Sequence, residues 1–92
     1  MPSTALSTTF WDRIADRYAK KPVADEAAYE KKLAITRRYL DDDATVLEVG
    51  CGTGTTAIRH APHVAHVHAT DISARMIEIA QQRADEANVD NV

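Results

Sequence analysis

Three glycines at alternate positions follow a short apolar run and form the clearest candidate for a ligand-binding turn in this sequence. The run is Val46 to Val49, and the turn reads Gly50-Cys51-Gly52-Thr53-Gly54. Because glycine has no Cβ, it can adopt positive φ and let a ligand approach the main chain. The free N–H groups of a following helix would then face an anionic group. The pattern therefore predicts a nucleotide-binding type of turn between a strand and a helix.

Two acidic residues distinguish this pattern from a flexible glycine loop. Glu48 is a carboxylate within an otherwise apolar strand, and Asp71 follows a second apolar run. An acid about 20 residues beyond such a turn is placed to accept hydrogen bonds from ribose hydroxyls. The dinucleotide fingerprint requires a third glycine where this chain has Thr55, so a nicotinamide or flavin oxidoreductase fits less well.

The segments that carry these residues resemble the class I S-adenosylmethionine-dependent methyltransferases. They are Glu48-Val49-Gly50-Cys51-Gly52-Thr53-Gly54 and Thr70-Asp71-Ile72-Ser73-Ala74-Arg75-Met76, at the separation usual in that family. A third segment, Phe10-Trp11-Asp12-Arg13-Ile14-Ala15-Asp16-Arg17-Tyr18, is similar to the leading helix of the ubiquinone/menaquinone biosynthesis methyltransferases. The resemblance extends over residues 10–92.

The resemblance implies a binding site for S-adenosylmethionine and a methyl transfer to a small-molecule acceptor. The glycines would let the methionyl part lie against the main chain, Glu48 would bind its ammonium end, and Asp71 would hold both ribose hydroxyls. Ile72 and Met76 would pack on the adenine, and Tyr18 would close over the site, although a packing role fits these three equally well. The expected cofactor-binding residues are Tyr18, Glu48, Gly50, Cys51, Gly52, Thr53, Gly54, Asp71, Ile72 and Met76. A sulfonium donor carries its own reactivity, so no catalytic side chain is assigned.

Helix and strand signals place these residues on successive elements. Thr9 and Asp12 have the spacing of a capping box for a first helix that ends near Lys20-Lys21-Pro22, after a frayed start over residues 1–9. Asp25 is the expected N-cap of a second helix. The glycine turn leads to a short helix that Pro62 closes, and Val64–Thr70 alternates as a second strand.

The end of the chain predicts one more helix and the approach to a further strand. Ser73 is the expected N-cap, Asn88 suits a left-handed residue after the helix, and residues 89–92 lead toward a third strand. We therefore expect an α/β fold with a Rossmann-like, partial doubly wound parallel sheet of β-α-β-α order, after two N-terminal helices. Residues 1–44 would form a helical cap segment, and residues 45–92 the first half of a cofactor-binding domain.

Composition narrows the class of protein and of partner. The chain has 92 residues, a net charge of −3 and no segment of the ~20 apolar residues that a membrane span requires. Residues 45–92 carry three basic and six acidic side chains, which argues against a nucleic-acid partner. We expect a cytoplasmic protein with neither a membrane nor a nucleic-acid partner. His60, His63, His66 and His68 are close in sequence, but no local carboxylate or cysteine completes a ligand set, so we expect no metal site.

A complete methyltransferase domain of this class has about seven strands, and two with the start of a third are recognisable here. We expect this chain to be the N-terminal part of a longer enzyme, inactive alone, that self-associates as a homo-oligomer or swapped dimer through its open sheet edge. Two alternatives stay open: a fragment of a NAD- or FAD-dependent oxidoreductase, and a non-catalytic nucleotide-binding or assembly module.

Overall fold

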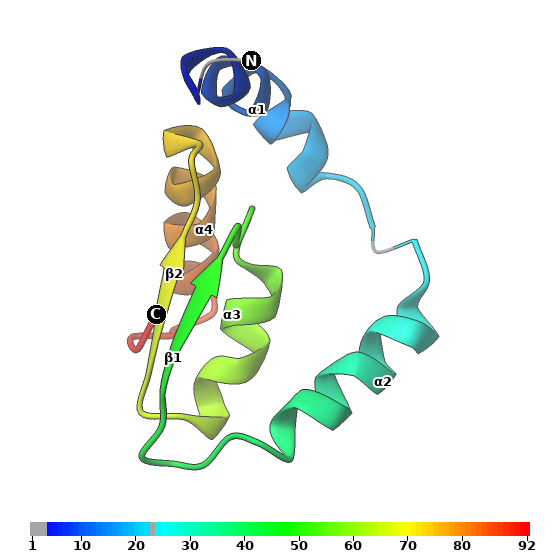
Figure 1. Ribbon diagram of the computed structural model, residues 1–92, viewed down its shortest axis with the longest axis vertical. Helices are drawn as coiled ribbons and strands as arrows, with labels where there is room; N and C mark the ends of the chain where they lie inside the picture. The colour runs from blue at the N-terminus through cyan, green and yellow to red at the C-terminus, as the bar shows by residue number, and fades with distance from the viewer. Residues whose placement is uncertain (1–3, 23) are drawn as a thin grey trace.

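The computed structural model describes residues 4–22 and 24–92 and has the α/β order expected from the sequence. Two helices come first, followed by strand, helix, strand and helix. Their bounds are α1 (Thr4–Ala19), α2 (Glu26–Arg37), β1 (Thr45–Val49), α3 (Thr55–His60), a 3-10 turn η1 (Ala61–His63), β2 (His66–Thr70) and α4 (Ala74–Glu86). Figure 1 shows α1 beyond the carboxyl ends of both strands, next to the start of α4.

The sheet consists of β1 and β2 in parallel register, with Val46 opposite Val67 and Glu48 opposite Ala69. Val46 and Val67 face inward and pack with Ala57 of α3 and with Val64. On the opposite face, Leu47 is 67% exposed and Val49 is 80% exposed. The helices cover one face of the sheet only, so this apolar face of β1 is left uncovered.

Helix ends follow local side-chain signals at three predicted positions. Asp25 Oδ1 accepts the N–H of Ala28 at 3.0 Å at the start of α2. Ser73 Oγ accepts the N–H of Met76 at 3.1 Å at the start of α4. Asn88, after α4, has a φ of 57°, the left-handed conformation expected of it. These predictions are confirmed.

The prediction for the start of α1 was wrong. The helix begins at Thr4, so Thr9 lies within it and cannot be its N-cap. The Asp12 side chain, expected to complete a capping box, contacts the start of α4 instead. Tertiary contact therefore overrides the local pattern, since a helix docked along its length does not depend on a cap.

The far edge of β2 begins to pair with the end of the chain. The strand starts at His66, two residues later than predicted, and Val67 N–H donates to Asn91 O at 2.8 Å. This bond agrees with the expected approach to a third strand. In the described residues, no helix combines the length and the apolar character needed to cross a membrane.

Candidate functional site

The glycine turn lies where β1 ends, with all three glycines at positive φ: 73° at Gly50, 56° at Gly52 and 83° at Gly54. Cys51 N–H donates to Thr70 O at 2.9 Å, so the first half of the turn is held to the end of β2. Gly54 is the N-cap of α3 and makes no side-chain cap bond. The turn is thus a defined backbone feature at the carboxyl edge of the sheet.

Gly52 and Gly54 have different surroundings. A Cβ added at Gly54 would lie 2.9 Å from Ala80 Cβ, because α4 packs directly against the turn. A Cβ at Gly52 would meet only the Tyr18 ring, at 3.8 Å from Cε1. Gly54 therefore permits close packing of a helix, whereas Gly52 keeps the space between the turn and Tyr18 open.

Asp71 lies at the mouth of the turn and is held there by two backbone N–H groups. Its Oδ2 accepts from Gly52 N–H and its Oδ1 from Ser73 N–H, each at 2.9 Å. A carboxylate has about four lone-pair positions, so each oxygen can still accept one more hydrogen bond. Asp71 is therefore oriented by the protein and retains acceptor capacity toward a ligand.

Two chambers meet at the glycine turn, separated by Tyr18, Gly50 and Gly52, which line both. The first, of about 510 Å³, is formed largely by apolar side chains with Asp71 among them. The second, of about 500 Å³, has a mixed lining in which Glu48 and other polar groups lie beside Ala19, Pro22 and Ala24. Further lining residues are Trp11, Val49, Thr70, Ile72 and Met76 in the first chamber, and Lys21, Tyr29, Cys51, Thr53, Thr55, Thr56 and Arg83 in the second.

The acidic and thiol groups of the second chamber are perturbed by burial. Burial raises the pKa of Glu48 above its ordinary value. Burial, with the nearby charges of Glu48 and Asp71, raises the pKa of the Cys51 thiol to about 11. Cys51 is therefore protonated at neutral pH and a poor nucleophile. Glu48 presents a partly desolvated carboxylate, which a cation in the chamber would stabilise.

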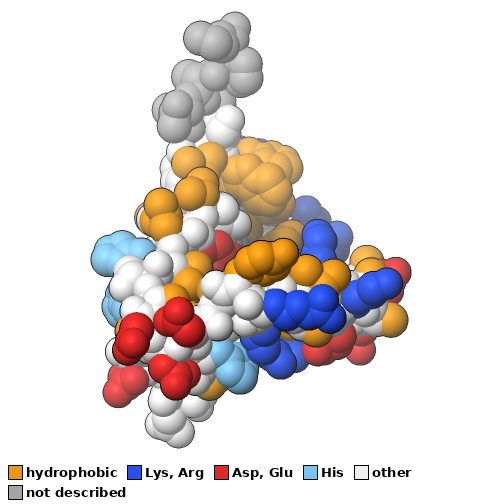
Figure 2. Space-filling view, turned by 60° about the horizontal axis from the view of Figure 1, so that its bottom comes forward, with side chains coloured by type: hydrophobic (Ala, Val, Ile, Leu, Met, Phe, Trp, Pro, Cys, Tyr) orange, Lys and Arg blue, Asp and Glu red, His pale blue; other side chains and the backbone are white. Residues whose placement is uncertain are grey.

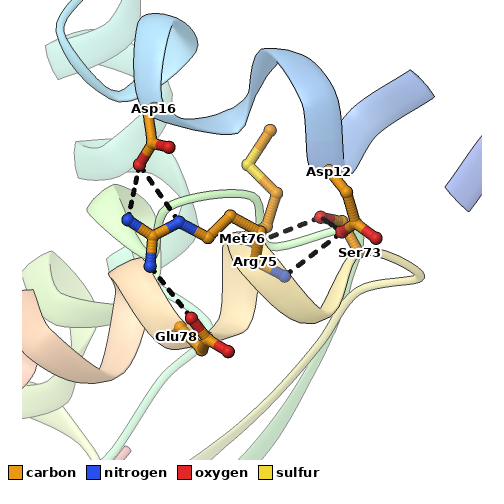
Figure 3. A network of polar contacts seen from close by, with 6 residues as sticks. All are labelled: Asp12, Asp16, Ser73, Arg75, Met76 and Glu78. Carbon is orange, nitrogen blue, oxygen red and sulfur yellow. Dashed lines mark hydrogen bonds and ion pairs between the residues drawn. The ribbon is translucent and has the colours of Figure 1, made fainter. Parts of the chain in front are cut away.

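A polar network docks α1 onto the start of α4 and so brings its aromatic side chains to the site. Asp12 Oδ1 accepts from the Ser73 hydroxyl at 2.5 Å and from Arg75 N–H at 3.2 Å, in the network drawn in Figure 3. Asp16 Oδ1 accepts from the Arg75 guanidinium, with the shorter contact at 2.6 Å. The hydrogen bonds from Ser73 and Arg75 lower the pKa of Asp12. Asp12 thus lies at the positive end of the α4 dipole, and Asp16 pairs with the guanidinium of Arg75.

The docked α1 supplies an aromatic wall. The rings of Trp11 and Tyr18 make an edge contact, with centroids 6.3 Å apart. Beneath them, Ala15 packs on Met76 and Ile79 of α4. Met76 is 2% exposed, and it both belongs to this core cluster and lines the first chamber.

Nine of the ten expected binding residues line the two chambers, and Gly54 lines neither. Ile72, Met76 and Asp71 line the first chamber, and Glu48, Cys51 and Thr53 line the second. Tyr18, Gly50 and Gly52 line both. Sequence reasoning missed Lys21, Tyr29 and Arg83, which come from the connection after α1, from α2 and from α4, respectively. Nothing in their local pattern signals a role, because only the tertiary fold brings them to the turn.

The histidine-rich segment does not form a ligand cluster in the part of the chain that the structure describes. His66 and His68 lie on the exposed face of β2, with ring centroids 5.2 Å apart. Over residues 4–22 and 24–92, no three histidine, cysteine or acidic side chains converge as a metal site would require.

Comparison with known proteins places this geometry in a family. The family model described as "Methyltransferase domain" matches residues 46–92. Magnesium-protoporphyrin O-methyltransferase of Rhodobacter capsulatus is 35% identical over 88 residues, covering 80% of this chain and 39% of that protein. A Staphylococcus aureus protein named as an uncharacterized RNA methyltransferase is 33% identical over 85 residues, covering 83% of this chain and 18% of that protein.

A solved structure agrees with these sequence matches. The YcgJ protein of Bacillus subtilis superposes with a TM-score of 0.64 at 29% identity, over 68% of this chain and 28% of that one. The chain thus spans well under half the length of the relatives it matches. The matched segment contains the glycine turn, Asp71 and both strands, which confirms the resemblance seen in the sequence: the chain belongs to the methyltransferase domain family and corresponds to part of a class I methyltransferase fold.

Proposed function

We propose that this chain binds S-adenosylmethionine and forms the donor-binding part of an enzyme that methylates a small molecule. The observation that carries the proposal is a pair of adjacent chambers that share Gly50 and Gly52 in their walls, a mainly apolar one with Asp71 and a more polar one with Glu48. A nucleoside joined through a sulfonium to an amino acid has the same two-part chemistry. The family implies a methyl donor, and the lining residues fit this one.

The first chamber suits the adenosine part of the donor. Asp71 offers free acceptor capacity on both oxygens for two ribose hydroxyls. Ile72, 51% exposed, presents apolar surface that a base would cover, and Trp11 closes the chamber from α1. A purine stacked among apolar side chains would remove this surface from water.

The second chamber suits the methionyl part. The half-buried Glu48 carboxylate has a raised pKa, and an ammonium group beside it would offset the cost of its burial. Gly52 leaves room for a ligand to approach the main chain below Tyr18. Cys51 and Thr53 line the chamber from the turn itself.

Methyl transfer from a sulfonium is a displacement in which the donor supplies the reactive group. The work of the protein is therefore to align the donor and to exclude water. In this chain, Asp71 and Glu48 would fix the two ends of the donor, and α1 would cover them through Trp11 and Tyr18. In this proposal, residues 1–44 act as the cap and residues 45–92 as the first half of the cofactor-binding domain.

The charge distribution favours a small-molecule acceptor over RNA. In Figure 2, Lys and Arg side chains gather on one side of the face shown, interspersed with Asp and Glu, while acidic and histidine side chains occupy the other side. Nucleic-acid binding requires a continuous basic surface. The net charge of −3 agrees with this preference, although five Staphylococcus aureus relatives carry the name of an RNA methyltransferase.

A thermal-shift series with S-adenosylmethionine, S-adenosylhomocysteine, NAD and FAD tests the proposal. Stabilisation by the two sulfur compounds alone supports it, stabilisation by NAD or FAD indicates an oxidoreductase fragment, and no response to any of the four indicates an assembly module. Asp71→Ala should weaken the binding of S-adenosylhomocysteine by about ten- to a hundredfold, as expected for loss of a charged hydrogen-bond acceptor. Calorimetry that finds equal affinity would exclude the ribose role.

A further inference from the structure

Arg83, near the end of α4, donates hydrogen bonds to oxygens from three other parts of the chain. Nη2 donates to the carbonyl oxygen of Ala19, the last residue of α1, at 2.5 Å. Nη1 donates to Thr53 Oγ1 in the glycine turn at 2.8 Å and to Thr55 Oγ1 at the start of α3 at 3.2 Å. A planar guanidinium with five donors suits such a junction, whereas lysine offers a single point charge.

The bond to Ala19 holds the end of α1 next to Tyr18. The last carbonyls of a helix lack partners within the helix and carry the negative end of its dipole, so a cation there is favourable. Ala19 directly follows Tyr18, whose ring lies over Gly52. Holding the Ala19 carbonyl therefore limits how far Tyr18 can move from the turn.

The same guanidinium also fixes the turn that Tyr18 covers. Thr53 lies between Gly52 and Gly54 and is 5% exposed. Of the ion pairs found among the described residues, none involves Arg83, so its charge serves these neutral oxygens. Arg83 also lines the second chamber, but its donors point to the protein.

We propose that Arg83 is a positioning residue for methyl-donor binding, an inference that rests on the proposed function. It ties the C-terminal end of α1 to the glycine turn and so keeps the Tyr18 ring over Gly52, where the two chambers meet. Arg83 thus acts on the donor through Tyr18.

The test compares Arg83→Met, which keeps the apolar stem, with Arg83→Lys, which keeps the charge but not the fork. Arg59→Met is the matched control, since Arg59 forms an exposed ion pair with Glu30 and lines neither chamber. Calorimetry with S-adenosylhomocysteine on the full chain, well below each melting temperature, gives the affinities. Hydrogen exchange at Lys20 and Lys21, whose N–H groups bond to Arg17 O and Tyr18 O, reports the end of α1 without a ligand.

Arg83→Met should weaken binding about tenfold or more, Arg83→Lys less, and Arg59→Met not at all. Exchange at Lys20 and Lys21 should be faster in Arg83→Met than in the control. When Tyr18 has already been replaced by alanine, Arg83→Met should reduce the affinity for S-adenosylhomocysteine much less, because Arg83 acts by positioning the Tyr18 ring. Three results would each overturn the inference: the same loss of affinity from Arg83→Met with and without Tyr18→Ala, unchanged affinity in Arg83→Met, or unchanged hydrogen exchange at Lys20 and Lys21. If the unsubstituted chain binds neither sulfur compound, the proposed function fails, and exchange alone then decides whether Arg83 holds α1.

Discussion

Replacing Gly54 with alanine should destabilise the fold through a steric contact that neither of the other glycines would create. The added Cβ would lie 2.9 Å from Ala80 Cβ and 3.2 Å from Ala80 Cα. Carbon atoms in favourable contact are about 3.5–4.0 Å apart, so α4 would have to move by roughly half an ångström or more. At Gly50 the added Cβ meets no atom within 4 Å. Gly50→Ala is therefore the matched control.

The expected magnitude follows from two contributions. Both variants place alanine at left-handed φ, 83° at Gly54 and 73° at Gly50. That strain costs about 1–2 kcal/mol, and overpacking against Ala80 adds about 1–3 kcal/mol at Gly54 alone. Gly54→Ala should thus lower the free energy of unfolding by about 1–3 kcal/mol more than Gly50→Ala, a large share of the ~5–15 kcal/mol typical of a domain.

Urea unfolding followed by circular dichroism measures this difference as a shift in midpoint at unchanged slope. Adding Ala80→Gly to Gly54→Ala removes the nearest atom and should recover part of the loss, even though glycine within α4 costs about 1 kcal/mol by itself. The rescue also covers the case in which Gly54→Ala alone fails to fold. Equal losses at Gly54 and Gly50, or no recovery with Ala80→Gly, would refute the packing argument. Gly52→Val should lose the donor, because its side chain enters the space below Tyr18; it also carries the strain of a branched residue at a φ of 56°, but not the overpacking against Ala80.

Three further predictions concern charge and the open sheet face. Burial raises the pKa of Glu48, so its ionisation opposes folding, and the free energy of unfolding falls as pH rises through that pKa. Glu48→Gln should therefore raise the melting temperature at pH 7 and weaken the binding of S-adenosylhomocysteine. A lower melting temperature for this variant would contradict the argument. Hydrogen bonds from Ser73 and Arg75 lower the pKa of Asp12 from its ordinary value of 3.8, so Asp12 stabilises the fold above 3.8 and this stabilisation is lost as pH falls through the folded-state pKa. Trp11 fluorescence should therefore show α1 loosening in acid. Asp12→Ala should remove that acid transition. Leu47, 67% exposed on the uncovered face, should promote self-association of the chain. Light scattering should detect oligomers, and Leu47→Lys should reduce their proportion. A monomer at all concentrations would exclude self-association through this face.

The features that the sequence predicted well are those in which a side chain acts on its own neighbourhood. Asp25 and Ser73 cap the helices that start beside them, and Asn88 takes the left-handed conformation that its short polar side chain tolerates. Such signals span three or four residues, so they can be read without a fold. The alternation in β2 and the glycine turn are of the same kind.

The features that could not be predicted depend on contacts across the chain. Asp12 was expected to cap its own helix, but its partner Ser73 is 61 residues away. Arg83 reaches Ala19 over a separation of 64 residues, and nothing near it in sequence marks that contact. A charged residue on a helix is ordinarily a solvated one, and only the docking of α1 on α4 gives these two their partners beside the site.

The glycine turn combines both kinds of information. The spacing of its glycines is local and identifies the turn, yet the reason for each glycine differs: Gly54 admits α4, and Gly52 leaves space under Tyr18. A motif that serves helix packing and ligand access together reports fold and site at once, which explains why so short a segment could indicate the family. Because the turn serves both helix packing and ligand access, a loss of donor binding after a substitution there is informative only when unfolding of the variant has also been measured. The contrast between Gly54 and Gly52 separates the two effects within a single motif.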